Sequence, residues 1–209
     1  MTCRPPEKTF IGREPFGIRI AVKDDANAVA DVLSEAFCAD PIMRWTFGGP
    51  EAIRRAMRIF FLDVYLRDGL VFVEQHGRAA AMWLLPGRHG DLSLLARAQF
   101  AGAITPLEGF LPILRGLRYQ AALARARELD PFLYLFAIGV RPDAQGLGAG
   151  SRLLSAGLEL ARALGVPARL ETSRVSNVTL YEKFGFRVRA EICAVKSAPK
   201  VWLMGRDFA

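Results

Sequence analysis

The sequence has few of the residues that build metal sites and disulfide frameworks. Among 209 residues it contains two histidines, His76 and His89, and three cysteines. Neither histidine stands in a metal-ligand spacing, so a multi-histidine metal site is excluded and we expect no metal. Cys3, Cys38 and Cys193 are odd in number and form no C-x-x-C pair, which argues against a disulfide framework. The expected location is therefore a reducing compartment, the cytosol.

The chain also lacks a long apolar run. Its N-terminal region holds no stretch like the apolar core of a secretory signal. The longest uncharged apolar stretches, residues 79–87 and 131–140, are much shorter than the roughly 18 residues that cross a bilayer, and both indicate buried strands. Charged residues and prolines interrupt the apolar segment 92–117, which indicates packed helices. We therefore expect neither export nor a membrane partner.

Positive charge is in excess, with 28 Lys+Arg against 21 Asp+Glu and a net charge of +7. The basic residues are spread along the chain. The densest group, Arg54, Arg55 and Arg58, is typical of the solvated face of an amphipathic helix. Because no RNP-like motif or localised basic stripe accompanies the charge, we expect no nucleic-acid partner.

Neither an internal repeat nor a flexible linker divides the chain. Its length fits one domain, at about 100–200 residues per domain. We expect an irregular N-terminal segment over residues 1–16 and a single domain over residues 17–209. A helical insertion at about residues 91–127 is expected to add a lid or a pocket wall.

The apolar periodicity predicts a succession of strands and helices. Two strand-like runs, residues 70–75 and 79–85, flank a glycine-containing turn and predict an antiparallel hairpin. Residues 132–140, 147–164 and 168–172 predict a strand–helix–strand unit. The other expected strands are residues 17–22, 188–192 and 200–204, and the other expected helices are residues 26–37, 51–67, 177–184 and, broken near residues 106 to 112, 91–127. The fold class is therefore α/β, or α+β by some definitions, with a mixed sheet and helices on its faces.

The most informative segment is a glycine-rich turn, residues 140–151, between an expected buried strand and the start of an expected helix. Gly146, Gly148 and Gly150 allow the backbone to approach a ligand closely. The unpaired amides of the first helical turn then point at that ligand with the positive end of the helix dipole behind them, which suits a pyrophosphate. A plain tight turn is the structural alternative. The segment is neither a Walker loop nor a dinucleotide fingerprint, so nucleotide hydrolysis and NAD binding are disfavoured.

The turn contains Gln145-x-x-Gly148-x-Gly150, which resembles the acyl-CoA signature Q/R-x-x-G-x-G/A of the GNAT superfamily of N-acetyltransferases. Residues 165–173 and 180–186 are similar to the strand and the Y-E-x-x-G-F segment that follow in that superfamily. More narrowly, two short segments resemble the puromycin N-acetyltransferase branch: Leu170-Glu-Thr-Ser173 and Val201-Trp-Leu-Met204.

This resemblance implies a mixed, mostly antiparallel central sheet splayed between its fourth and fifth strands, with helices on both faces. The pantetheine arm of acetyl-CoA would lie in the splay and pair with the backbone of Ile138, Gly139 and Val140, as an added strand would. Asn177 is assigned to orient pantetheine or substrate, with a helix N-cap as its structural alternative. The resemblance assigns the pyrophosphate to the backbone of Gln145, Gly146, Leu147, Gly148, Ala149, Gly150 and Ser151.

Acyl transfer to an amine needs a neutral nucleophile and a proton for the leaving thiolate. The resemblance assigns that proton to Tyr181, whose phenol is protonated at neutral pH and would transfer its proton more easily if the site lowered its pKa. Glu171 is the candidate base, because strand alternation places it opposite Leu170 and Thr172. An ion pair with an arginine is its structural alternative. Three other carboxylates are alternative bases: Glu35, Asp40 and Glu74.

These residues together predict an acetyl-CoA-dependent N-acetyltransferase that acts on the primary amine of a small molecule, such as an antibiotic-like compound. Trp45, Phe47 and Trp83 are candidates to line the acceptor pocket, with the hydrophobic core as their alternative place. The competing hypothesis is a non-catalytic acyl-CoA-binding regulatory module, which would keep the glycine-rich turn but need neither Tyr181 nor a base. The positive mean hydropathy leaves room for a buried interface, so a homodimer is also considered.

Overall fold

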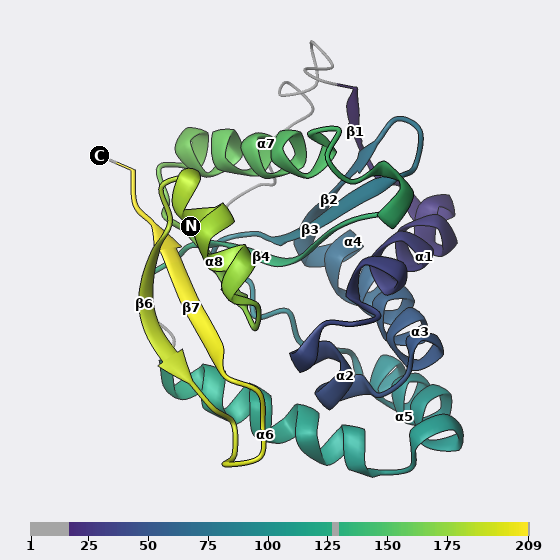
Figure 1. The fold of residues 1–209 in the computed structure, drawn as a ribbon. Coiled ribbons are helices and arrows are strands. Elements are labelled where there is room, and N and C mark those ends of the chain that lie inside the picture. Colours follow the sequence, from purple (N-terminus) through teal and green to yellow (C-terminus); the bar gives the residue numbers. More distant parts are fainter. Residues whose placement is uncertain (1–16, 127–129, 209) are drawn as a thin grey trace.

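The computed structural model describes residues 17–126 and 130–208. Within these residues seven strands form one sheet in the order β1-β2-β3-β4-β5-β7-β6, and helices cover both of its faces (Figure 1). The irregular segment expected over residues 1–16 lies outside the described residues. The predicted class, a mixed and mostly antiparallel sheet with flanking helices, is confirmed.

The first half of the sheet is antiparallel. β1 (Ile18–Ile20) pairs with β2 (Gly69–Glu74), and β2 pairs with β3 (Ala79–Leu84). Gly77, in the tight turn between β2 and β3, has a φ of +67°, which a residue with a side chain rarely adopts. The predicted hairpin is therefore confirmed. β3 pairs on its other side with β4 (Leu133–Val140).

The second half of the sheet diverges from the first. β4 runs parallel to β5 (Ala168–Thr172), and β5 pairs antiparallel with β7 (Val201–Arg206), which pairs with β6 (Arg187–Ile192). The β4 side of the parallel ladder contains only Leu133, Tyr134 and Leu135. From residue 136 to residue 140, β4 has no strand partner on its β5 side within the described chain. The sheet is thus splayed between its fourth and fifth strands, as expected.

A β-bulge in β4 accompanies the splay. Leu135 is paired with Trp83 and Ala137 with Met82, so Phe136 is an extra residue between two adjacent partners on β3. A bulge of this kind bends its strand and increases the local twist. Because the bulge follows directly on the last β4 residue that pairs with β5, it turns the rest of β4 away from that neighbour.

The helices on one face come mostly from the first half of the chain. α1 (Ala26–Phe37) has the predicted bounds, and α3 (Pro50–Phe60) continues through a π-helical turn, η3 (Phe61–Tyr65), into α4 (Leu66–Asp68). This run matches the helix expected over residues 51–67. The short helix α2 (Pro41–Phe47) was not predicted, although an N-capping Asp followed by Pro is a recognisable start signal.

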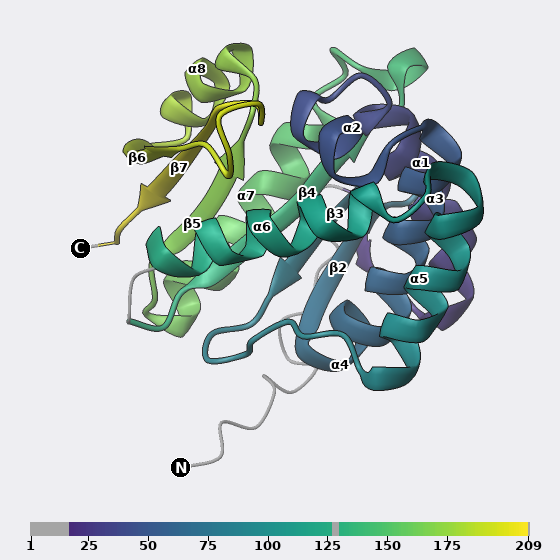
Figure 2. The same ribbon diagram turned by 90° about the horizontal axis from the view of Figure 1, so that it is seen from below.

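Two further helices occupy the expected insertion. α5 (Leu94–Glu108) and α6 (Leu111–Ala126) are separated at Gly109 and Phe110, while Pro106 lies inside α5. α5 packs against α3, and α6 packs against α2 at one end and β6 at the other. Figure 2 shows α6 crossing from the α2 side of the molecule toward β5 and β6. It therefore bridges the two halves of the splayed sheet.

The opposite face carries α7 (Ala149–Leu164) and α8 (Val175–Lys183). α7 lies close over β3, because a Cβ at Gly157 would stand within 2.1 Å of the Trp83 ring. Trp83 is fully buried there, which makes it a core residue. α7 ends at Gly165, the predicted stop, in a left-handed conformation with φ of +65°. No helix within residues 17–126 and 130–208 is long and apolar enough to cross a membrane.

Candidate active site

A cavity of about 590 Å³ lies at the splay. Its walls come from β4 and β5, from α2, α5 and α6, and from α8. This volume is within the range of small-molecule sites. Four predicted site residues from three separate elements line it together: Ile138, Glu171, Asn177 and Tyr181.

Tyr181 enters the cavity from α8 and is 6% exposed. Its ring makes an edge contact with Phe186 at a centroid distance of 5.9 Å. Burial raises the pKa of the Tyr181 phenol well above its usual value, and the negative charge of Asp40 raises it further. The site therefore does not lower this pKa, as easier proton transfer would require. Tyr181 instead keeps its proton, and so remains a hydrogen-bond donor, throughout the neutral range.

Glu171 lies on β5 between the large cavity and a second cavity of about 330 Å³. Its carboxylate accepts a hydrogen bond from the Tyr134 hydroxyl, which belongs to β4. Burial of Tyr134, together with the Glu171 charge, raises the pKa of that phenol well above its usual value. Glu171 thus faces the splay as strand alternation predicts, and it contacts a neutral phenol there.

Asp40 is the N-cap of α2 and is buried. Its side chain accepts hydrogen bonds from the backbone N–H groups of Ile42 and Met43, at 3.1 and 3.0 Å. The Ser173 hydroxyl, just beyond β5, lies 3.1 Å from both carboxylate oxygens, and Arg174 Nε lies 3.7 Å from one of them. Asp40 also lines the large cavity. It therefore joins α2 to the other side of the splay.

The remaining alternative bases lie elsewhere. Glu35 on α1 forms an ion pair with Arg141 at 3.4 Å. Glu74 accepts hydrogen bonds from the backbone N–H groups of His76 and Arg78 in the β2–β3 turn. Burial opposes ionisation of Glu74, but the hydrogen bonds from Arg78 hold its pKa below the usual value. Neither carboxylate is among the residues that line the large cavity, so the geometry favours Glu171 and Asp40.

The glycine-rich turn leads from β4 into α7. Gly146 and Gly148 have φ values of +80° and +76°, in the left-handed region that favours glycine. Gly148 is the N-cap of α7, and its carbonyl accepts the first helical hydrogen bond from Arg152 at 3.0 Å. The N–H groups of the three residues between them therefore have no acceptor within the helix. Residues 145–148, which lead into these donors, are exposed, whereas Ala149 is buried and Gly150 is half-buried.

Side chains hold this turn in shape. Gln145 Nε2 donates to the carbonyl oxygen of Val140 at 3.3 Å, which ties the turn to the end of β4. The Arg152 guanidinium reaches back to the carbonyl oxygen of Leu147 at 3.0 Å. This contact places a positive charge beside the unpaired amides of the first turn of α7. The turn thus has the geometry and the charge of an anion site at a helix N-terminus.

The structure adds a packing role for one predicted site residue and corrects the alternative role of another. A Cβ at Gly139 would stand 2.7 Å from the Cβ of Ala36, so this glycine allows α1 to pack closely against β4. The N-cap alternative for Asn177 is wrong, because α8 begins at Val175 and its N-cap is Arg174. Asn177 lies within the first helical turn and lines the cavity.

The aromatic residues of the cavity differ from those expected. Phe47 lines it, but Trp45 packs beneath the Arg115 guanidinium at 5.4 Å and Trp83 belongs to the core on the α7 side. Seven other aromatic rings that line the cavity were not predicted, because they come from distant parts of the chain and none stands in a motif: Phe37, Phe60, Tyr65, Phe100, Tyr119, Tyr134 and Phe136. Within the described residues no group of three or more His, Cys, Asp or Glu could hold a metal ion.

Comparison with known proteins identifies relatives of the chain. Residues 93–186 match the model of the acetyltransferase (GNAT) family. An uncharacterized N-acetyltransferase of Schizosaccharomyces pombe is 27% identical over 198 residues, which cover 88% of this chain and 78% of that protein.

Solved structures share the fold. A structure described as histone acetyltransferase HPA2 and related acetyltransferase from Corynebacterium glutamicum superposes with a TM-score of 0.68 at 22% identity, over 92% of this chain and 96% of that one. The polyamine N-acetyltransferase of Drosophila melanogaster superposes with a TM-score of 0.61 at 17% identity, over 91% of this chain and 99% of that one. For arylalkylamine N-acetyltransferase 2 from Aedes aegypti the TM-score is 0.60 at 14% identity, over 92% and 98%.

Proposed function

We propose that the chain, of which residues 93–186 match the acetyltransferase (GNAT) family, transfers the acetyl group of acetyl-CoA to the primary amine of a small molecule. One observation carries this proposal. The glycine-rich turn leads from the end of β4 to the unpaired amides at the start of α7, and β4 is also the strand that separates from β5 beside the cavity that Tyr181 lines. A single strand therefore connects a candidate anion site to a candidate reaction site.

The residues of the turn suit the pyrophosphate of acetyl-CoA. We assign this role to the backbone of residues 145–151, where left-handed glycines and the unpaired N–H groups of the first turn of α7 favour an anion. Arg152 adds positive charge, and Gln145 holds the turn in place. Along β4, the backbone of Ile138, Gly139 and Val140 supplies hydrogen-bonding groups for the pantetheine arm, since β5 does not pair there.

The reacting groups are assigned to the cavity. Acetyl-CoA, when bound, supplies the acetyl group as a thioester. Glu171 takes the proton from the attacking amine, directly or through water. Tyr181, which is protonated at neutral pH, donates its hydrogen bond and then its proton to the leaving thiolate. Asn177, beside Tyr181 in the cavity wall, orients pantetheine or the acceptor.

A small acceptor is favoured by the position of α6. This helix crosses the splay and contributes cavity-lining residues, which limits the room for a folded protein substrate (Figure 2). Relatives with this fold carry names that refer to polyamines and arylalkylamines. The two segments that resemble the puromycin N-acetyltransferase branch add puromycin to the candidate acceptors.

The test is calorimetric titration of acetyl-CoA into the purified protein, followed in the same sample by thiol release with a panel of amines. The panel contains puromycin, a polyamine, an arylalkylamine and a short peptide with a free N-terminus. Binding together with thiol release on a small amine supports the proposal. Binding without release on any amine would favour the regulatory module, and absence of binding by folded protein would refute the acetyl-CoA site.

Compartment and assembly remain proposals. Cys38 and Cys193 are free, exposed thiols, which suit a reducing compartment such as the cytosol. Exposed apolar side chains on α5, on α6 and in the turn between them, among them Leu94 and Phe110, offer surface for a homodimer. Sedimentation equilibrium of the purified chain distinguishes monomer from dimer.

A further inference from the structure

We propose that the acceptor is a monoamine with a bulky aromatic or branched apolar body, and that this body lies in the part of the cavity between α5, α6 and the bulge of β4. This inference rests on the proposed function and names its substrate class. It is carried by the chemistry of the cavity wall, which is continuous and aromatic on one side and contains few charges.

The aromatic wall is a chain of ring contacts. Phe47, Phe60 and Phe100 touch one another in a triangle with centroid distances of 6.0 to 6.1 Å. Phe60 also contacts Phe136 at 5.2 Å, and Phe136 stacks on Tyr65 at 5.3 Å. All five residues line the cavity. They present ring faces and edges that favour an aromatic or branched apolar group.

The helix α6 completes this part of the wall. Ile113 and Gly116 line the cavity from α6, and Ala101 lines it from α5. A Cβ at Gly116 would lie 3.7 Å from the Thr46 side chain, which is an ordinary contact distance. The absence of a side chain at residue 116 therefore leaves room in the wall for part of a ligand.

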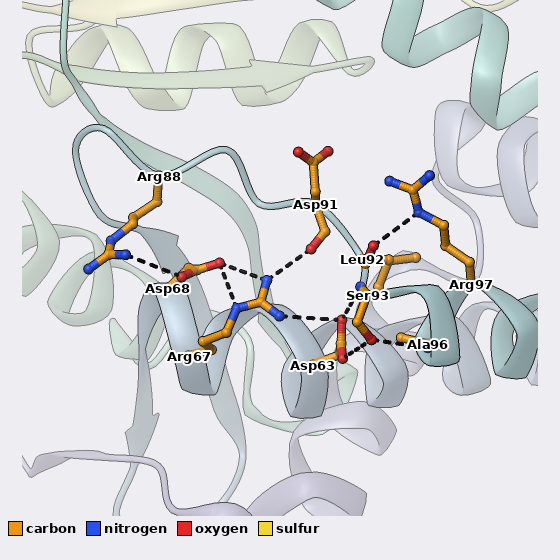
Figure 3. A network of polar contacts seen from close by, with 9 residues as sticks. All are labelled: Asp63, Arg67, Asp68, Arg88, Asp91, Leu92, Ser93, Ala96 and Arg97. Atoms are coloured by element: carbon orange, nitrogen blue, oxygen red, sulfur yellow. Dashed lines mark hydrogen bonds and ion pairs between the residues drawn. The ribbon is translucent and has the colours of Figure 1, made fainter.

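The wall is fixed to the rest of the protein at both ends of α5. Asp63 on η3 accepts hydrogen bonds from the Ser93 backbone N–H and hydroxyl, at 2.8 and 2.7 Å, and the Ser93 hydroxyl caps α5 (Figure 3). At the other end, Glu108 Oε1 accepts a hydrogen bond from the Gly49 N–H at 2.6 Å. The α6 side chain Arg115 donates to the Trp45 carbonyl oxygen at 3.2 Å. A wall held in this way selects among ligands by shape.

Charge argues for one ammonium group. The carboxylates among the described lining residues are Asp40, Glu171 and Asp91. Asp40 caps α2 and lies 3.7 Å from Arg174, and Asp91 is exposed. Glu171 faces the splay. A second ammonium placed against the aromatic wall would lose its hydration without meeting a carboxylate, so a polyamine is disfavoured.

The substrates for the test are three amines with the same reacting end: n-butylamine, putrescine and 4-phenylbutylamine. We expect the wild-type kcat/KM for 4-phenylbutylamine to exceed that for each of the others by at least roughly tenfold, since one buried aromatic group supports discrimination of this order. A higher kcat/KM for putrescine or n-butylamine would overturn the inference while the proposed function stands. Acetyl-CoA binding without acetylation of any amine would overturn both.

Matched glycine variants locate the pocket. Gly116→Leu adds a side chain in the cavity wall, and Gly102→Leu adds the same side chain on α5 at an exposed residue with nothing within 4 Å. We expect Gly116→Leu to lower kcat/KM for 4-phenylbutylamine about tenfold. Its kcat/KM for n-butylamine should stay within about twofold of the wild-type value. Gly102→Leu should leave kcat/KM for both substrates unchanged.

A second variant keeps the test independent of any misfolding in Gly116→Leu. Phe100→Ala removes one ring of the wall and should also lower kcat/KM for 4-phenylbutylamine more than for n-butylamine. The Kd for acetyl-CoA and the Tm confirm that each variant is folded. If both wall variants lower kcat/KM equally for the two substrates while they bind acetyl-CoA normally, the apolar body of the acceptor does not lie against this wall.

Discussion

The hydroxyl oxygen of Ser173 lies 3.1 Å from each carboxylate oxygen of Asp40, across the open end of the β4–β5 splay. Asp40 begins α2, and Ser173 follows β5, so this contact joins two walls of the cavity. Burial is the main cause of the raised pKa of the Tyr181 phenol, and the Asp40 carboxylate is the second cause. One carboxylate therefore caps a helix, closes the site and influences the proposed acid.

Substitution of Asp40 separates its capping role from its charge. Asp40→Ala removes the cap and the contact with Ser173, and we expect it to lower the free energy of unfolding by about 1–2 kcal/mol. Asp40→Asn keeps a capping oxygen and should cost less than Asp40→Ala. Urea denaturation measures both. Turnover of the folded variants identifies the base. If the Asp40→Asn variant were inactive while the Glu171→Gln variant remained active, Asp40 and not Glu171 would be the base.

Replacement of Tyr181 by Phe tests the proposed acid. We expect kcat to fall by about 10²–10⁴-fold, because no group then protonates the thiolate. The Kd for acetyl-CoA should change little, because the ring is retained. Stopped-flow thiol release and calorimetry measure the two quantities. Unchanged turnover would remove the acid role from Tyr181.

The raised pKa of Tyr181 also makes a prediction about pH. In the unfolded chain a tyrosine loses its proton near its usual pKa of 10.0, whereas the folded protein retains the proton on Tyr181. The folded state therefore binds more protons at high pH, and stability should fall as the pH rises above 10. In Tyr181→Phe this loss should be smaller. An ultraviolet titration of the folded proteins measures how many phenols lose their protons near the usual pKa of 10.0. If the variant has one such phenol fewer than the wild type, the raised pKa of Tyr181 is contradicted.

Glu171→Gln tests the proposed base. A base must be deprotonated, so the wild-type rate should rise with pH through its pKa, and this acidic limb should disappear in the variant. We expect kcat to fall by about 10²-fold or more. Glu182→Gln, an exposed carboxylate on α8 that does not line the cavity, is the matched control. A pH–rate profile unaltered by Glu171→Gln would direct attention to Asp40.

Gly148→Asp tests the anion site at α7. The change introduces both backbone strain, at a φ of +76°, and a negative charge beside the unpaired amides. Gly148→Asn is the control, because Asn has nearly the same shape, tolerates the left-handed region better than most residues and carries no charge. We expect acetyl-CoA Kd to rise about tenfold or more in Gly148→Asp relative to Gly148→Asn. Equal affinities would make the turn a structural feature only.

Asp63 supplies a stability prediction for the cavity wall. Burial alone would raise the pKa of Asp63, but the hydrogen bonds from Ser93 and the nearby Arg67 hold it below its usual 3.8. A lowered folded-state pKa contributes stability above pH 3.8 that is lost as the pH falls through the folded value.

We therefore expect Asp63→Asn to cost about 1–2 kcal/mol at neutral pH and progressively less as the pH falls below 3.8. Urea denaturation of both proteins across this range measures the difference. Ser93→Ala should lower the free energy of unfolding by less in the Asp63→Asn variant than in the wild type, because both changes remove the same contact. A cost that does not depend on pH would contradict the ionised contact.

The sequence by itself determined the local features. Apolar periodicity lies within the element that it specifies, which explains why α1 and β5 have the predicted bounds. The glycine-rich turn is also local, since its left-handed residues and unpaired amides follow from the order Gln145 to Gly150 along the chain. The candidate acid and base were found because the resemblance and strand alternation single out Tyr181 and Glu171.

Only the tertiary structure decided the features that depend on residues far apart in the chain. The bulge at Phe136 depends on the register with β3, and the aromatic wall gathers rings from α2, α3, η3, α5 and β4. The contact of Asp40 with Ser173 spans 133 residues, and the pKa of Tyr181 is raised by burial and by the charge of Asp40, which is also distant in sequence. Packing and desolvation are properties of the assembled fold, so a pattern read along the chain does not contain them.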